Sequence, residues 1–232
     1  MKIKLLYFII REILNWIKGN IRLYNLRNKY PENIFNKGVS ICDKSELSKF
    51  IVLFSDVSLF DCKIGKYTYI QSNSALCNVE VGNFCSIANN VSIGLANHPL
   101  DMVSTSPVFY DNTQPLPKFF ANTKLFNVTL PRTIIQSDVW IGQGVIVKAG
   151  LKIGVGSIIG AGSVVTKDIP PYSIAVGNPC RIIKFRFSEE IIKGLISTNW
   201  WDYEDAKLHQ LTKYFISPEK FLAILEKNDF SS

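Results

Sequence analysis

The sequence predicts an all-β core, in which short parallel strands form a stacked coil, with a long loop extruded from the coil and helices at both ends. Three observations predict this fold class. Aliphatic residues recur every six positions in two blocks, and an irregular stretch of about forty residues separates the blocks. The chain is also 47% apolar, which is enough to fill a substantial core. Its 232 residues fit one domain with a small appendage at either end.

The N-terminal segment, residues 1–30, is predicted to form a basic amphipathic helix. At 100° per residue, cations gather on one side and large apolar residues on the other. Seven basic residues and one acidic residue lie here, so the segment supplies most of the net charge of +7 and the rest of the chain is nearly neutral. The basic residues are Lys2, Lys4, Arg11, Lys18, Arg22, Arg27 and Lys29.

Two interpretations of this helix remain open. Its longest apolar run, residues 5–10, is too short to cross a bilayer. Residues 1–28 would therefore either lie on an anionic membrane surface or pack against the end of the domain. The two interpretations are compatible with each other.

The hexad repeat is assigned to residues 38–187. Neither a helix nor a simple alternating strand explains a period of six, so each hexad is predicted to be a short strand plus a corner, with successive turns paired as parallel strands. Glycine in the second place suits a corner that needs positive φ or close packing. The aliphatic residues that head the hexads are expected to fill the interior: Ile64, Ile70, Leu76, Val81, Ile87, Ile93, Ile135, Ile141, Val147, Ile153, Ile159 and Val165. A second inward set is expected at Thr68, Ser74, Val91, Val145, Ser157 and Ser163.

The interruption at residues 95–133 is predicted to be a catalytic loop. Long loops on a regular scaffold usually carry function, and this loop holds His98, one of two histidines in the chain. Transfer of an acyl group to a hydroxyl needs a base whose pKa lies near the working pH. We expect His98 to be that base, and Asn97, Phe109 and Tyr110 to contact the acceptor.

Other chemistries fit the sequence less well. Cys85 is expected to point inward, where a thiol is inert, and the chain has no G-x-S-x-G elbow, so direct attack by the acceptor is favoured over a covalent intermediate. Five cysteines match no zinc or disulfide spacing. Reduced thiols suit a cytoplasmic protein. A carbonic-anhydrase-type zinc site needs about three imidazoles, so no metal is predicted, and no patch for nucleic acid appears.

Four motifs resemble the hexapeptide-repeat acyltransferases, in particular the xenobiotic acetyltransferase branch, which also holds many bacterial sugar and polysaccharide O-acetyltransferases. The motifs are NHP at 97–99, DVWIG at 138–142, the segment at 159–187 and NWWDYEDAKL at 199–208. The resemblance covers roughly residues 38–210. It implies a left-handed parallel β-helix, a homotrimer with sites between subunits, acetyl-CoA as acyl donor, and a catalytic histidine at the position of His98.

The acyl donor is expected to lie along the last turns of the coil. Small residues in IGAGS permit close backbone approach, and cations just beyond suit phosphate groups. Matching this segment to the family's cofactor segment supports a donor-binding role for Ala161, Thr166, Lys167, Arg181 and Lys184. By the same resemblance, Trp140 would lie beside the thioester end.

Residues 188–232 are predicted to form a helical cap over the open end of the coil. Ser188 followed by two acids reads as a helix start, and Ser217-Pro218 opens a second helix. Trp200 and Trp201 between them are expected in the core.

The function predicted from these features is O-acetylation of a sugar hydroxyl in a bacterial surface polysaccharide, capsule or lipopolysaccharide O-antigen, or in its precursor. The basic helix favours a saccharide acceptor, because glycan assembly occurs at the inner membrane face. The expected location is cytoplasmic and peripheral at that face. The alternatives are an antibiotic O-acetyltransferase of the chloramphenicol or streptogramin type, a nucleotide-aminosugar N-acetyltransferase, and a non-catalytic scaffold.

Overall fold

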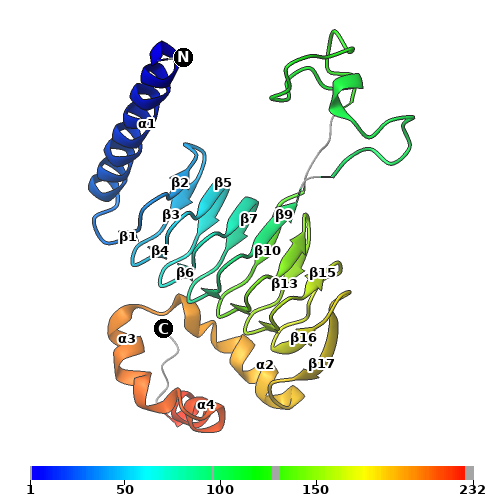
Figure 1. Ribbon diagram of the computed structural model, residues 1–232. Helices are drawn as coiled ribbons and strands as arrows, with labels where there is room; N and C mark the ends of the chain where they lie inside the picture. Colours follow the sequence, from blue (N-terminus) through cyan, green and yellow to red (C-terminus); the bar gives the residue numbers. More distant parts are fainter. Residues whose placement is uncertain (1, 96, 127–130, 228–232) are drawn as a thin grey trace.

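The computed structural model describes residues 2–95, 97–126 and 131–227. Parts of three predicted segments lie outside these residues: residue 1 of the helix, residues 96 and 127–130 of the loop, and residues 228–232 of the cap. The fold is a left-handed parallel β-helix with α1 (Lys2–Lys29) at one end and three helices after the coil. Figure 1 shows the coil as a stack of short strands from which the loop projects.

The strands form two sheets that wrap around the coil. One sheet has the order β1-β4-β6-β8-β11-β14-β16-β17, and every pair in it is parallel except β16 with β17. Its members are β1 (Ile34–Phe35), β4 (Val52–Leu53), β6 (Tyr69–Ile70), β8 (Ser86–Ile87), β11 (Trp140–Ile141), β14 (Ile158–Ile159), β16 (Ser173–Val176) and β17 (Arg181–Phe185). The second sheet holds β2 (Ser40–Ile41), β3 (Glu46–Leu47), β5 (Ser58–Ile64), β7 (Ala75–Val81), β9 (Ser92–Leu95), β10 (Thr133–Ile135), β12 (Ile146–Lys148), β13 (Lys152–Ile153) and β15 (Val164–Val165).

The strand register confirms that three hexads make one turn. Ile34 pairs with Val52 and Trp140 pairs with Ile158, each 18 residues further along the chain. Turns that contain a five-residue step are one residue shorter, as in the pairing of Tyr69 with Ser86. Each side chain therefore stacks on its counterpart in the next turn.

The interior contains the residues that the repeat assigned to it. All twelve hexad heads are at most 2% exposed, and the six residues of the second inward set are at most 1% exposed. Buried hydroxyls in this set bond to backbone groups, which removes the penalty of an unpaired polar atom. Thr68, for example, donates to the Gly82 carbonyl at 2.9 Å and accepts from the Cys85 amide at 3.0 Å.

The coil also extends further towards the N-terminus than residue 38. Its first strand starts at Ile34, and the heads continue the same spacing back through the chain. These earlier heads are Phe35, Ile41, Leu47, Leu53 and Leu59. Their hexads lack glycine in the second place, which explains why the repeat is harder to recognise there.

With the exception of Gly94, second-place glycines serve close packing between turns rather than positive φ. A Cβ on Gly142 would lie 2.6 Å from the amide nitrogen of Ala161 in the next turn. Positive φ instead falls two residues later, at places held by Phe84 (φ 59°) and Gly144 (φ 68°) among others. The sequence suggested positive φ or close packing as the reason for glycine at these places. Close packing between turns is the reason at most of them.

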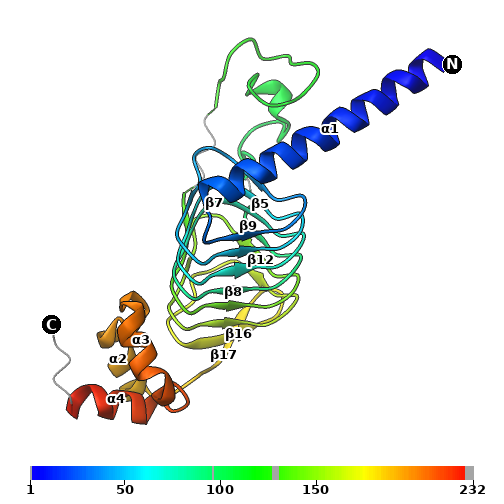
Figure 2. The ribbon, with the colours of Figure 1, turned by 90° about the vertical axis from the view of Figure 1, so that its left-hand side faces the viewer.

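Helix α1 crosses the N-terminal end of the coil, and its final turns hold it there (Figure 2). Leu23 and Leu26 pack against the core, Arg22 donates to the Ile41 carbonyl, and Arg27 donates to the Phe35 carbonyl at 2.8 Å. Within the described residues, no helix has both the length and the hydropathy needed to cross a membrane.

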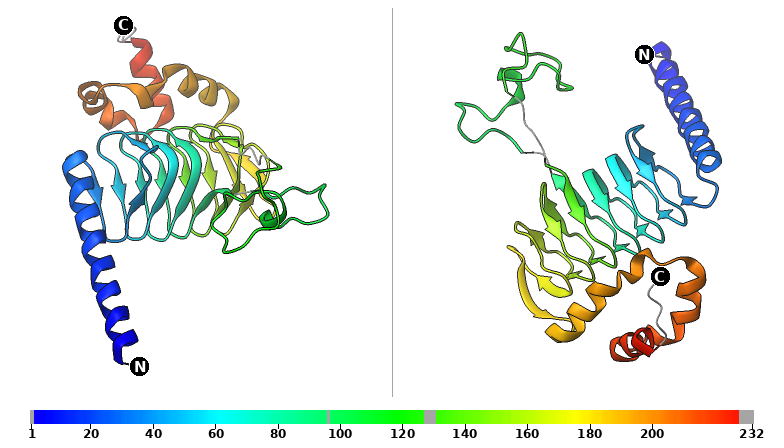
Figure 3. Two further views of the ribbon diagram at one scale, coloured as in Figure 1. Left: turned by 90° about the horizontal axis from the view of Figure 1, so that it is seen from above. Right: turned by 180° about the vertical axis from the view of Figure 1, so that it is seen from behind.

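The C-terminal helices are present, but they pack along a lateral edge of the coil rather than over its open end (Figures 1 and 3). Lys66 donates to the Tyr203 carbonyl at 3.0 Å, and Asn83 donates to the Trp201 carbonyl at 3.0 Å. Ser188 caps the first of these helices by accepting from the Ile191 amide, as expected. The elements are α2 (Glu189–Thr198), η2 (Trp200–Asp202), α3 (Asp205–Leu211), η3 (Thr212–Tyr214) and α4 (Pro218–Lys227).

A ladder of aromatic rings explains the lateral position. Phe50, Tyr67 and Phe84 occupy equivalent corners of successive turns, and their rings stack at centroid distances of 5.0 and 5.1 Å. Trp200 continues the ladder at 5.4 Å from Phe84 and is 9% exposed. The apolar surface that the helices cover therefore lies on this edge of the coil.

Candidate active site

The loop leaves the coil directly after β9 and returns at β10. At the exit, Gly94 has φ +79°, and a Cβ there would lie 1.9 Å from the carbonyl oxygen of Cys77. Only glycine fits this point without strain, because the chain is both left-handed and in contact with the neighbouring turn. The return is held by Arg132, whose guanidinium pairs with Asp61 at 2.8 Å.

The loop has a small core of its own. The rings of Phe109 and Phe120 stack at 5.2 Å, and Tyr110 meets Phe126 edge to face at 6.1 Å. The amides of Phe120 and Leu125 donate to the carbonyls of Val108 and Tyr110 at 2.8 Å. A loop stabilised by its own side chains can hold a functional group in one place.

Asp111 organises the polar half of the loop. It is 3% exposed, and its carboxylate accepts from the Thr113 hydroxyl at 2.6 Å and the Gln114 amide at 2.9 Å. Lys124 lies 3.6 Å from the same carboxylate. The hydrogen bonds from Thr113, followed by those from Gln114, hold the pKa of Asp111 at about 2, so it stays ionised at neutral pH.

His98 stands at the start of the loop with its ring exposed. Its Nδ1 lies 2.8 Å from the carbonyl oxygen of Thr105, which can only accept, so Nδ1 carries the proton in the neutral ring. The Tyr110 hydroxyl lies 3.3 Å from the same Nδ1 and donates to the Thr105 carbonyl at 3.4 Å. In this tautomer the lone pair lies on Nε2, where a general base would accept a proton.

The three expected acceptor contacts occupy different surroundings. Asn97 is exposed beside His98. Phe109 is 48% exposed and presents a ring stacked on Phe120. Tyr110 is only 3% exposed, and its hydroxyl lies at His98, so its position suits holding the imidazole.

Two of the expected donor residues share one column of the coil surface. Trp140 pairs with Ile158, Ile158 with Ile174, and Ile174 with Lys184. Because neighbouring strands lie about 4.8 Å apart, the Cα atoms of Trp140 and Lys184 are about 14 Å apart, which is three strand spacings. Trp140 is 51% exposed, so this outer strip has an aromatic face at one end and a cation at the other.

The other expected donor residues lie on the same last turns of the coil. Ala161 lies at the adjoining corner, against Gly142. Arg181 is paired with Val176 in the last strand of the same sheet. Thr166 and Lys167 follow β15 on the next face, where the Cys180 amide donates to the Val164 carbonyl at 2.9 Å. All four residues are exposed.

The structure therefore groups the expected site residues in two places. His98, Asn97, Phe109 and Tyr110 belong to the loop, whereas the donor residues lie on the last turns of the coil. Within the described part of one chain, Figure 1 shows the loop projecting outward from the coil.

The thiols agree with the expectation for Cys85. It is fully buried, and burial raises the pKa of its thiol to about 12, so it is a neutral packing group at physiological pH. All five cysteines are free.

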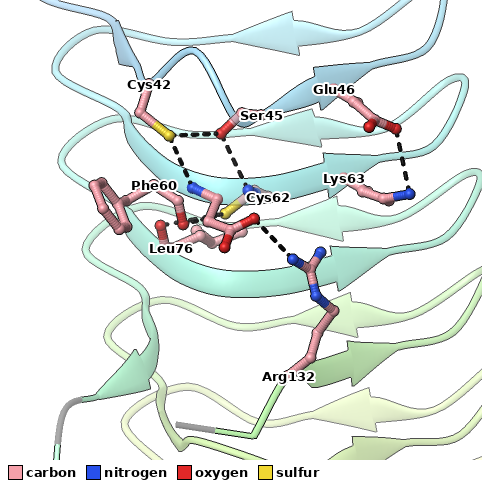
Figure 4. A network of polar contacts seen from close by, with 9 residues as sticks. Cys42, Ser45, Glu46, Phe60, Cys62, Lys63, Leu76 and Arg132 are labelled. Carbon is pink, nitrogen blue, oxygen red and sulfur yellow. Dashed lines mark hydrogen bonds and ion pairs between the residues drawn. The ribbon is translucent and has the colours of Figure 1, made fainter. Parts of the chain in front are cut away.

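The polar network at the loop's return was not predicted from the sequence (Figure 4). There the amide of Asp61 donates to the Cys42 sulfur at 3.0 Å, and the Asp61 carboxylate pairs with Arg132. One nitrogen of the Arg132 guanidinium is buried and has no partner among the described residues. The signal available in the sequence was the position of Arg132, directly before the repeat resumes.

Sequence comparisons relate the chain to known acetyltransferases. The chain matches no protein-family model. It is 38% identical over 140 residues to a chloramphenicol acetyltransferase of Escherichia coli, covering 59% of this chain and 65% of that protein. It is 37% identical over 136 residues to a probable macrolide acetyltransferase of Lysinibacillus sphaericus, covering 55% and 71% respectively. Among solved structures it resembles a hexapeptide-repeat-containing acetyltransferase from Vibrio cholerae, with 21% identity, coverage of 71% and 80%, and a TM-score of 0.45.

The chain therefore belongs to the hexapeptide-repeat acetyltransferases, in their xenobiotic acetyltransferase-like branch. Its matches span between 59% and 65% of the length of the first three curated relatives.

Proposed function

We propose that this protein transfers an acetyl group from acetyl-CoA to a hydroxyl of a saccharide, either a bacterial surface polysaccharide or its precursor. The single observation that carries the proposal is the state of His98. Its Nδ1 lies 2.8 Å from the Thr105 carbonyl oxygen, and its Nε2, on an exposed residue, has no partner among the described residues. Family membership supports acetyl transfer, and the exposed strip from Trp140 to Lys184 supports a bound CoA donor.

The proposed reaction needs only one proton carrier. As the acceptor oxygen attacks the carbonyl carbon of the thioester, its proton passes to Nε2 of His98. The bond from that carbon to sulfur then breaks, and the imidazolium returns the proton to the departing thiolate. The Thr105 carbonyl stabilises the imidazolium by accepting from Nδ1.

We propose that a homotrimer brings the two groups of site residues together. The loop and the donor strip project from different parts of one chain, and a neighbouring subunit would supply one group to the other. Trp140, at 51% exposure, would then lie in a shared groove. Molecular mass in solution tests the stoichiometry, and a monomer that is fully active would contradict it.

The saccharide is favoured by α1, a basic amphipathic helix that a drug-modifying enzyme does not need. We therefore place the protein in the cytoplasm, peripheral at the inner face of the cytoplasmic membrane through residues 1–28. An antibiotic acceptor is the second candidate, because two similar proteins are named chloramphenicol acetyltransferase and probable macrolide acetyltransferase.

The experiment is thiol release from acetyl-CoA by the purified full chain, with product masses recorded. Chloramphenicol, a macrolide, bacterial glycans and nucleotide aminosugars are offered in parallel. Turnover with glycans alone supports the proposal, and turnover with a drug alone replaces the saccharide by the antibiotic. N-acetylation of an aminosugar would change the acceptor class. The absence of CoA binding and of any turnover would leave a non-catalytic scaffold.

A further inference from the structure

The apolar face of α1 is a large surface that the rest of the chain leaves uncovered. Eight large apolar side chains make up this face, and each of them is between 40% and 66% exposed. The helix contacts the coil through another sector, which contains Leu23 and Leu26. The eight exposed residues are Leu6, Ile9, Ile10, Ile13, Leu14, Ile17, Ile21 and Tyr24.

Cations border this face. Lys4, Arg11 and Lys18 form a stripe along the helix, and Glu12 is the one acidic residue of α1. A groove between α1 and the first turns of the coil adds Lys18, Arg22 and Lys29 among its lining residues, with Asp43 as the one acid in that lining. This charge pattern complements a surface of anionic lipid phosphates.

The width of the apolar face favours a lipid surface over a second copy of the helix. On a helical wheel the apolar residues cover about half of the circumference. Two-stranded coiled coils use a narrower seam at heptad positions a and d, and Asn20 would fall within that seam. Trp16 is 64% exposed, as expected for an aromatic residue in the headgroup region.

The position of α1 relates this surface to the loop. Figures 1 and 2 show α1 crossing the N-terminal end of the coil, and Figures 1 and 3 show α1 and the loop projecting on the side opposite α2–α4. α1 and the loop therefore both project from the coil on the side away from α2–α4.

We infer that α1 lies flat on an anionic bilayer with its apolar face in the headgroup region, and that the acceptor is a saccharide carried by a membrane lipid. The proposed contact with lipid does not depend on any enzymatic activity. The proposed class of acceptor rests on the proposed acetyl transfer. A helix bound in this way would keep the enzyme at the surface in which such acceptors diffuse.

Vesicle binding by the full chain tests the contact. The protein should sediment with vesicles that contain phosphatidylglycerol, and raising the salt concentration should weaken its binding. Ile13→Glu/Ile17→Glu should weaken partitioning by at least about tenfold. Replacing Lys4, Arg11 and Lys18 by Gln should cost about fivefold for each charge that is lost.

Ile216→Glu is the matched control, because Ile216 is an 83% exposed isoleucine away from α1. This variant should bind vesicles as the parent does. If Ile13→Glu/Ile17→Glu binds vesicles normally, the membrane contact is overturned. If instead that variant changes the molecular mass of the lipid-free protein, a second copy covers the face and the inference is also overturned.

The acceptor is tested with one saccharide in two forms, attached to its lipid in vesicles and released from the lipid. Ile13→Glu/Ile17→Glu should lower the rate on the lipid-bound form at least about tenfold, in proportion to the lost partitioning, and leave the rate on the released form unchanged. Equal rates of the variant and the parent on both forms would overturn the lipid-carried acceptor. Failure of the parent on both forms would contradict the proposed function itself, while the vesicle result would stand.

Discussion

The coil and the loop are stabilised in different ways. In the coil, twelve hexad heads are at most 2% exposed, and each stacks on an equivalent residue of the next turn. In the loop, Leu100 is 94% exposed, and order comes from a few specific contacts around Tyr110 and Asp111. We therefore expect stability to depend on the coil, and activity to depend on loop residues that contribute little to stability.

Leucine truncation in both regions is the strongest way to break this comparison. Leu53→Ala removes a fully buried side chain from the coil and should lower the free energy of unfolding by about 2–5 kcal/mol. Leu100→Ala should change it by less than about 0.5 kcal/mol, because the side chain is in solvent. Urea unfolding measures both variants. Equal losses would mean that the loop is part of the cooperative core.

Glycine replacement at the loop exit should have the next largest effect. Gly94→Ala combines strain at φ +79° with a clash against the Cys77 carbonyl, and should cost about 2–4 kcal/mol. Gly144→Ala is the matched control, because Gly144 has φ +68° but open space around its Cα, so strain alone should cost about 1 kcal/mol. Identical losses in urea unfolding would show that contact with Cys77 does not determine the exit.

Removal of the Tyr110 hydroxyl sharpens the account of the loop. Tyr110→Phe keeps the buried ring but loses the polar contacts with His98 and Thr105. We expect kcat to fall about fivefold, as for one hydrogen bond of about 1 kcal/mol, with KM for acetyl-CoA and the melting temperature unchanged. A change in KM alone would assign Tyr110 to substrate binding instead.

The pH response of Asp111 should be the smallest effect. Its pKa is lowered to about 2 in the folded loop, so the contribution of the carboxylate is complete above its ordinary value near 4 and is lost as the pH falls through 2. The carboxyl carbon resonance of Asp111 should titrate with a midpoint near 2, and Asp111→Asn should remove that resonance. A midpoint near 4 would mean that the bonds to Thr113 and Gln114 are absent in solution.

Much of the coil could be predicted from the sequence because its rule is local and periodic. A head such as Ile141 and a small partner such as Val145 recur at fixed spacing, and both are buried. The heads before Ile64, such as Phe35 and Leu53, were not among the predicted heads, because the corners that follow them use aromatic and polar residues instead of glycine. The same spacing would have found them.

The positions of the C-terminal helices and of the loop's ends could not be predicted, because they depend on contacts between residues far apart in the sequence. Rings at intervals of 17 residues stack on one another only because of the strand register: Phe50, Tyr67 and Phe84. Their stack directs Trp200 and the C-terminal helices to a lateral edge of the coil. The pairing of Arg132 with Asp61 likewise joins two turns. His98 could be selected from the sequence, but its bond to Thr105 required the folded loop.

We propose that catalysis resides in the loop, on His98, while the coil supplies stability and the donor surface. The most direct test of this proposal is the rate of thiol release from acetyl-CoA by His98→Ala and the parent, with the same acceptor and with melting temperatures recorded. The account predicts a fall in kcat of about 100-fold or more, with an unchanged melting temperature and unchanged CoA affinity. A folded His98→Ala protein that turns over at nearly the parent rate would contradict it.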